Sequence, residues 1–171
     1  MKKTTLFGLF VFIGTLAFGQ TLETNEIDGF TNNSVKRTSW ESINMTMKFT
    51  AFFRVSRIND NTYLDLKMMI GTGVFSIGKG QEFMIKLSDG SIVKLANSEF
   101  TVTCRGCGAK GLSGSDAQGI QVFYPINTEQ IEQLKNGTGT ELRIYTKDGY
   151  VENDMKAKNY NKIVRALSLV E

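Results

Sequence analysis

The chain of 171 residues contains no histidine, and this absence excludes more chemistry than any other feature of its composition. Most serine and cysteine hydrolases need an imidazole as general base, and zinc sites are usually built from cysteine and histidine. Only two cysteines are present, so these residue types cannot complete a four-ligand zinc site. We therefore expect no catalytic triad and no metal site.

Proline occurs once, and no low-complexity tract or internal repeat marks a linker or an array. Residues 20–44 are polar and predict an ordered lead-in, and residues 45–171 predict a single β-rich domain. A chain of about 150 residues is long enough to bury roughly 68–70% of its unfolded surface in one core.

A long apolar run is found only at the start of the chain. Two lysines precede an apolar stretch over residues 6–18, and small residues at 17 and 19 suit a signal peptidase. The run of roughly 13 residues is shorter than the ~20 that a membrane-spanning helix needs. We expect residues 1–19 to be a signal peptide, and the mature protein to be periplasmic or secreted and not membrane-spanning.

Net charge is low once this segment is removed. The chain has 20 basic and 17 acidic residues, and the loss of Lys2 and Lys3 leaves 18 against 17, a net charge of +1. A nucleic-acid-binding surface usually needs a concentrated basic face. Nucleic acid is therefore not an expected partner.

Alternation of apolar residues predicts β-hairpins. Apolar side chains recur at every second position over residues 45–55 and again over 64–70, with a turn signal at 59–61. A second hairpin joins residues 83–87 and 92–95. A three-residue loop with Gly90 in a left-handed conformation gathers the apolar side chains of this hairpin on one face.

Further short strands are expected at 74–77, 100–104, 120–124, 142–145 and 150–151. Asn127 and Gln130 predict a capping box that begins a short helix near 127–136, with a left-handed stop at its Asn-Gly end. Helical spacing from about residue 154 predicts a C-terminal helix, with residues 169–170 as extended chain. The fold class is mainly β: an antiparallel β-sandwich, with a curled, barrel-like sheet as the alternative.

Cys104 and Cys107 form a CxxC pair at the end of a predicted strand. A thioredoxin-like site places this motif at a helix N-terminus, where the dipole lowers the thiol pKa. No helix pattern follows here, so a structural disulfide in an oxidising compartment is the favoured interpretation. Two thiols that never pair, and a thiol-disulfide catalyst, remain the alternatives.

A glycine-rich loop over residues 105–118 contains a literal GxGxxG at 106–111. A dinucleotide site needs these glycines to turn a strand into a helix, and the residues that follow do not favour a helix. We expect no cofactor there. Long loops carry recognition, so the loop is a possible interaction site through Arg105, Lys110, Leu112 and Asp116.

Acidic residues could in principle cleave glycosides as a pair. We expect each of them to be a solvated turn or edge residue, and most phenylalanines to be core residues. Phe52 is the exception, because it is out of register beside Phe53. The acidic residues considered are Glu82, Asp89, Glu99, Asp116 and Glu141.

Short segments give the chain a resemblance to a known group. They are Trp40-Glu41, Tyr63–Leu66, Phe75–Gly80, Leu87–Gly90, Tyr124–Ile126 and Arg143–Gly149. Through them the chain resembles uncharacterised exported β-rich proteins of Gram-negative bacteria. The resemblance implies export and a β-rich fold, and it carries over no activity and no functional residue.

Three functions follow from these observations. The first is an exported, non-enzymatic binding module whose partner is a protein or a cell-envelope component. The second is a barrel-like carrier, which predicts a cavity lined by Phe and Met side chains. The third is an enzyme, either a thiol-disulfide oxidoreductase at the CxxC pair or a carboxylate hydrolase.

Overall fold

A computed structural model describes residues 20–46, 48–71, 73–107 and 118–171. The predicted signal peptide lies outside the described residues. The protein is mainly β, with antiparallel sheets, two helices and no closure into a barrel. The larger sheet contains β1 (Leu22–Ile27), β2 (Ser34–Thr38), β3 (Glu41–Met45), β4 (Phe49–Ile58), β5 (Asn61–Ile70), β10 (Cys104–Arg105) and β11 (Gln118–Ile126).

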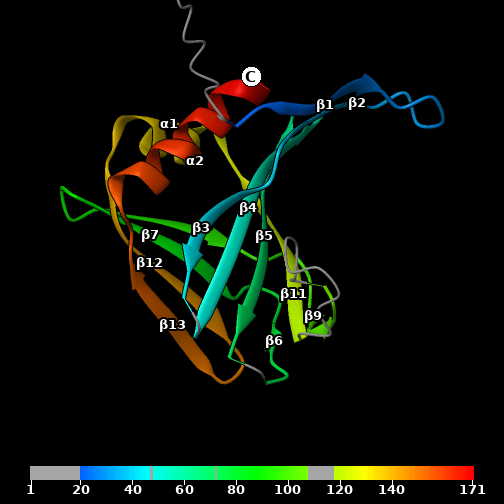
Figure 1. Cartoon of the computed structure of the whole chain (residues 1–171). Helices are drawn as coiled ribbons and strands as arrows, with labels where there is room; N and C mark the ends of the chain where they lie inside the picture. The colour runs from blue at the N-terminus through cyan, green and yellow to red at the C-terminus, as the bar shows by residue number, and fades with distance from the viewer. Residues whose placement is uncertain (1–19, 47, 72, 108–117) are drawn as a thin grey trace, which may run out of the picture.

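The smaller sheet packs against the larger one, and the two helices lie together at one end of the molecule (Figure 1). The order of its strands is β13-β12-β7-β8. A pair of two-residue strands forms a third, minor sheet. These elements are β7 (Glu82–Leu87), β8 (Ile92–Ala96), β12 (Gly139–Thr146), β13 (Gly149–Asp154), the minor pair β6 (Ser76–Ile77) and β9 (Thr101–Val102), and the helices α1 (Thr128–Asn136) and α2 (Ala157–Val170).

One core lies between the two sheets. The predicted alternation on β4 is confirmed, because Phe49, Ala51, Phe53 and Val55 are all buried. The ring centroids of Phe83 on β7 and Tyr124 on β11 are 5.8 Å apart, which joins the two sheets. The core is therefore filled by interdigitating side chains, as in a β-sandwich.

Helix α2 covers the end of the sandwich and contacts β2, β3, β4, β12 and α1. Its apolar face includes Tyr160 and Leu167, both 1% exposed. The Tyr160 hydroxyl donates to the Leu134 carbonyl of α1 at 2.5 Å. The helix continues to Val170, so the expectation of extended chain at residues 169–170 is wrong.

The predicted hairpin of β7 and β8 is confirmed in register. Ile85 pairs with Val93 and Phe83 with Leu95, and Gly90 has a φ of +89°. Leu87 accepts a hydrogen bond from the Gly90 amide, which closes the three-residue loop. Burial of one face selects this register over its one-residue slip.

Helix α1 begins as predicted and ends differently. Asn127 and Gln130 form the reciprocal capping box. Gly137 has a φ of −93°, so the left-handed stop is wrong. Glycine is needed there for close packing, because a Cβ atom at Gly137 would lie 2.7 Å from Leu87 Cδ1.

Residues 20–44 are more than a lead-in, because they form β1, β2 and β3 of the larger sheet. β2 and β3 pair in succession with β4, and Trp40 lies at the break between them. Met45 ends β3 and is 67% exposed, so it does not share the inner face of β4. The expected strand at 100–104 is divided into β9 and β10, which belong to different sheets. Its apolar residues do not join the core, since Phe100 and Val102 are 62% and 44% exposed.

Candidate functional site

The two cysteines lie at disulfide distance, with their Cα atoms 5.3 Å apart. Cys104 belongs to β10, and Cys107 follows a turn at Gly106, whose φ is +75°. The Cys107 amide donates to the Cys104 carbonyl at 3.2 Å. The pair therefore lies on a strand end and the turn that follows it, whereas a thioredoxin-like redox site places its first cysteine at a helix N-terminus.

Of the predicted interaction loop, only Arg105 can be placed. It is exposed and pairs with Gln118 across β10 and β11. Lys110, Leu112 and Asp116 lie outside the described residues, as does most of the GxGxxG segment.

The acidic residues considered from the sequence occupy surface positions where the structure describes them. Asp89 accepts hydrogen bonds from Ser91 in the β7–β8 turn, and these bonds lower its pKa. Glu141 forms an ion pair of 2.6 Å with Lys86. Glu99 is exposed, and Glu82 is half-buried.

A pocket of about 380 Å³ lies on the face of the larger sheet opposite the core, and we call it the outer-face pocket. Two rows of directly opposed residues form its floor. The first row runs Arg54, Asp65, Phe123 across β4, β5 and β11. The second runs Arg37, Ser56, Tyr63 across β2, β4 and β5. Residues of the 97–101 segment, among them Asn97, Glu99 and Thr101, complete the lining.

Asp65 is the unusual residue of this pocket. Asp65 is only 1% exposed, although it lies on the outer face of the sheet. Arg54 Nε and Ser56 Oγ both donate to its Oδ2 atom at 2.7 Å. Its Oδ1 atom is buried with no hydrogen-bond partner in the described part of the chain. Such an orphaned acceptor is costly, so its presence requires an explanation, such as a binding role.

The charge balance at Asp65 is set by competing effects. Burial raises the pKa of its carboxyl group, and the hydrogen bonds from Ser56 and Arg54 lower it in part. Arg37 acts on the same carboxylate through space. The backbone of Arg37 pairs with β1 and β4, and its guanidinium group forms no ion pair within the described residues. The pocket lining thus holds two guanidinium groups and two acids, the buried Asp65 and the exposed Glu99.

Aromatic rings flank these charges. Arg54 Cζ lies 4.6 Å from the centroid of the Trp40 ring, and Lys67 Nζ lies 4.4 Å from it. Phe123 is 43% exposed on the pocket floor. The predicted core role is therefore wrong for Phe123 and Phe100, while Phe52 lies half-buried on the outer face, opposite Lys67.

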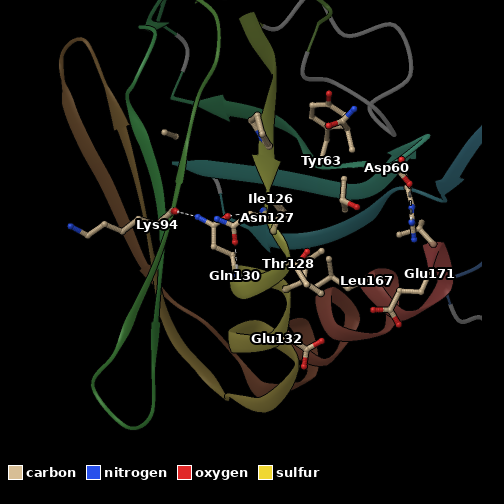
Figure 2. A pocket seen from close by; sticks show the side chains of 17 residues that line it. Asp60, Tyr63, Lys94, Ile126, Asn127, Thr128, Gln130, Glu132, Leu167 and Glu171 are labelled. Atoms are coloured by element: carbon tan, nitrogen blue, oxygen red, sulfur yellow. Dashed lines mark hydrogen bonds and ion pairs between the residues drawn. The ribbon is translucent and has the colours of Figure 1, made fainter. Parts of the chain in front are cut away.

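A larger pocket, about 720 Å³, lies between the β4–β5 turn, the start of α1 and the end of α2 (Figure 2). Its polar groups bind each other: Gln130 donates to the Lys94 carbonyl at 2.6 Å, and the Arg57 guanidinium lies 3.8 Å from Asp60. Asn127 is used in capping α1. The larger volume favours this pocket as a binding site, whereas the unpartnered Asp65 carboxylate oxygen favours the outer-face pocket.

The described part of the chain contains neither a metal-binding cluster nor a membrane-spanning helix. No three acidic or cysteine side chains there are grouped so that they could hold a metal ion. Within the same residues, no helix has the length and apolar character required to cross a bilayer.

Sequence reasoning missed Asp65 and Arg54 as site residues. Their signal is that Arg54 and Asp65 alternate with the inward-facing apolar residues on both strands of the first hairpin. The two-residue turn that pairs Ile58 with Asn61 places Arg54 opposite Asp65. Burial of that pair could not be foreseen, because it depends on segments distant in sequence.

Comparison with known proteins adds no identity: no protein-family model, no curated protein and no solved structure matches the chain. The resemblance drawn from short sequence segments stays a prediction.

Proposed function

We propose that this protein is an exported, non-catalytic binding module that captures a polar component of the cell envelope in the outer-face pocket. The observation that carries the proposal is Asp65, which lines the outer-face pocket and whose buried Oδ1 atom has no hydrogen-bond partner in the described chain. A bound molecule that donates a hydrogen bond would satisfy this atom.

Several features support this function. The Cys104–Cys107 pair at bonding distance suits an oxidising compartment. The outer-face pocket combines a few polar groups with aromatic surface, which is the usual composition of a ligand site. Its volume of about 380 Å³ falls within the roughly 300–1,000 Å³ of small-molecule sites.

The carrier hypothesis fits the fold less well. The larger sheet does not close into a barrel. The Phe and Met side chains that would line a cavity, such as Phe53 and Met68, belong to one packed core and are each 0% exposed. A hydrophobic ligand would have to displace these side chains.

Binding can be tested by titrating the mature protein with soluble fractions of a Gram-negative envelope digest while following the fluorescence of Trp40, the single tryptophan. Asp65→Asn is the informative variant. Arg54 holds the side-chain oxygen toward itself, so the amide nitrogen takes the place of Oδ1 and donates where the carboxylate accepts.

The matched control is Asp148→Asn, which removes an acid from an exposed turn. We expect a saturable fluorescence change that Asp148→Asn retains and Asp65→Asn loses, with circular dichroism showing both variants folded. Equal binding by the folded Asp65→Asn variant would refute the proposal. If that variant does not fold, Arg37→Gln replaces it with the same criterion.

A further inference from the structure

The outer-face pocket makes three chemical demands on a ligand, and they come from separate residues. Asp65 offers an acceptor, Arg37 offers a positive charge, and Phe123 and Tyr63 offer aromatic surface. These groups lie in two neighbouring rows on β2, β5 and β11 of one sheet, so the backbone pairing fixes their relative positions. A ligand that meets all three demands can be named by class.

The ligand group that donates a hydrogen bond to Asp65 is expected to be neutral. The Asp65 carboxylate lies in a site that also contains two guanidinium groups, those of Arg54 and Arg37. The second acid of the lining, Glu99, is exposed, so solvent screens its charge more than that of the buried Asp65. An ammonium ion placed there would be repelled by both, and in a low-dielectric environment this repulsion is large. A hydroxyl group donates the same hydrogen bond without that repulsion.

The partner of Arg37 is an anion. The Arg54 guanidinium already binds Asp65, whereas Arg37 has no ion pair among the described residues. A planar guanidinium binds a carboxylate through two parallel hydrogen bonds. The ligand therefore carries a carboxylate a few bonds away from its hydroxyl group.

Phe123 and Tyr63 present aromatic surface in the pocket, so the ligand also needs an apolar face. Phe123 lies directly opposite Asp65 across β5 and β11, and it is 43% exposed. Tyr63 occupies the neighbouring row. The C–H face of a saccharide ring packs on aromatic rings while its hydroxyl groups point sideways toward polar partners.

We infer that the ligand of the outer-face pocket is a sugar acid of the uronic acid class, with a ring hydroxyl on Asp65, the carboxylate on Arg37 and the ring face on Phe123. This inference rests on the proposed function and narrows it. The pocket is open to solvent, so the uronic acid is either a free monosaccharide or a residue of an acidic polysaccharide.

The test is calorimetric titration of the full mature protein with D-glucuronate and D-galacturonate, compared with glucose, galactose and L-alanine. We expect at least one uronate to bind about ten- to a hundredfold more tightly than its neutral sugar, because the charged hydrogen bond is lost. Alanine, which brings an ammonium group, should not bind. Tighter binding of an oligogalacturonide than of galacturonate would identify the polysaccharide as the source.

Two variants check the contacts. Arg37→Gln should remove the preference for the uronate over the neutral sugar. Arg57→Gln, on the same sheet but facing the larger pocket, should keep that preference. Phe123→Ala should weaken the uronate and the neutral sugar alike, because it removes only the apolar contact.

The outcomes separate the two proposals. If neither uronate nor oligomer binds, while envelope fractions still change Trp40 fluorescence in an Asp65-dependent way, the sugar-acid inference is wrong and the binding function stands. Uronate binding that is unaffected by folded Arg37→Gln also overturns the inference. If the binding of every envelope fraction and every sugar is independent of Asp65 and Arg37, both proposals fail.

Discussion

Replacement of Gly139 by alanine should destabilise the fold strongly, although it adds a single methyl group. Gly139 begins β12 and is buried against α2. A Cβ atom there would lie 2.4 Å from Cδ2 and 2.6 Å from Cε2 of Tyr160, and 3.1 Å from Cγ2 of Ile85. The Tyr160 ring cannot withdraw easily, because its hydroxyl is bonded to the Leu134 carbonyl.

The expected loss of stability has two parts, the overpacking around the new methyl group and the loss of the Tyr160 hydrogen bond. Overpacking of a buried site costs about 1–3 kcal/mol. Loss of the Tyr160 hydrogen bond adds about 0.5–1.5 kcal/mol. We therefore expect the free energy of unfolding to fall by about 2–4 kcal/mol, which lowers the urea midpoint by roughly 1–2 M for a protein of this size.

Urea denaturation followed by far-ultraviolet circular dichroism measures this change. Gly29→Ala is the control, because a Cβ atom there has no neighbour within 4 Å. Adding Tyr160→Phe to Gly139→Ala should recover part of the loss, since the ring is then released from Leu134. A Gly139→Ala midpoint equal to that of Gly29→Ala would refute the packing argument.

Three further predictions concern single groups. Tyr124→Phe should raise the free energy of unfolding by about 1 kcal/mol, because the buried hydroxyl has no partner in the described chain; a loss of stability in urea denaturation would contradict this. Gly90→Val should lower it by about 1–3 kcal/mol, since a β-branched residue is strained at a φ of +89°, and a neutral thermal melt would disprove it. Burial raises the pKa of Asp65 above its ordinary value of 3.8, so the folded state holds this proton more tightly than the unfolded state. The wild type should therefore gain stability relative to Asp65→Asn as the pH falls from neutral toward about 4; a difference that stays constant or shrinks would show that burial does not dominate.

Much of the fold could be predicted because its signals are local. Alternation placed Phe53 and Leu64 on the inner face, and the loop length at Gly90 set a register that the structure confirms. The capping box at Asn127 is equally local. Where the prediction was wrong, a distant neighbour decided: Leu87 takes the space that a side chain at Gly137 would need.

The candidate site was harder to predict for the same reason. Arg54 and Asp65 look like ordinary polar residues of a solvated sheet face. Their burial arises because Trp40 and the 97–101 segment lie at this face. The CxxC pair can be recognised in the sequence because its residues are contiguous. The outer-face pocket is formed by four strands and a loop, so no contiguous motif marks it.

The position of α2 has a consequence for how the protein is made. This helix is the last element of the chain, yet it packs on β2, β3 and β4, which are among the first, and Lys36 on β2 binds the carbonyl of Glu171. The early strands therefore keep an apolar surface uncovered until α2 has been synthesised. Contacts so distant in sequence form slowly and leave intermediates prone to aggregate. A nascent chain of this design stays incompletely folded until α2 is made, and the proposed export through a narrow channel would require that state.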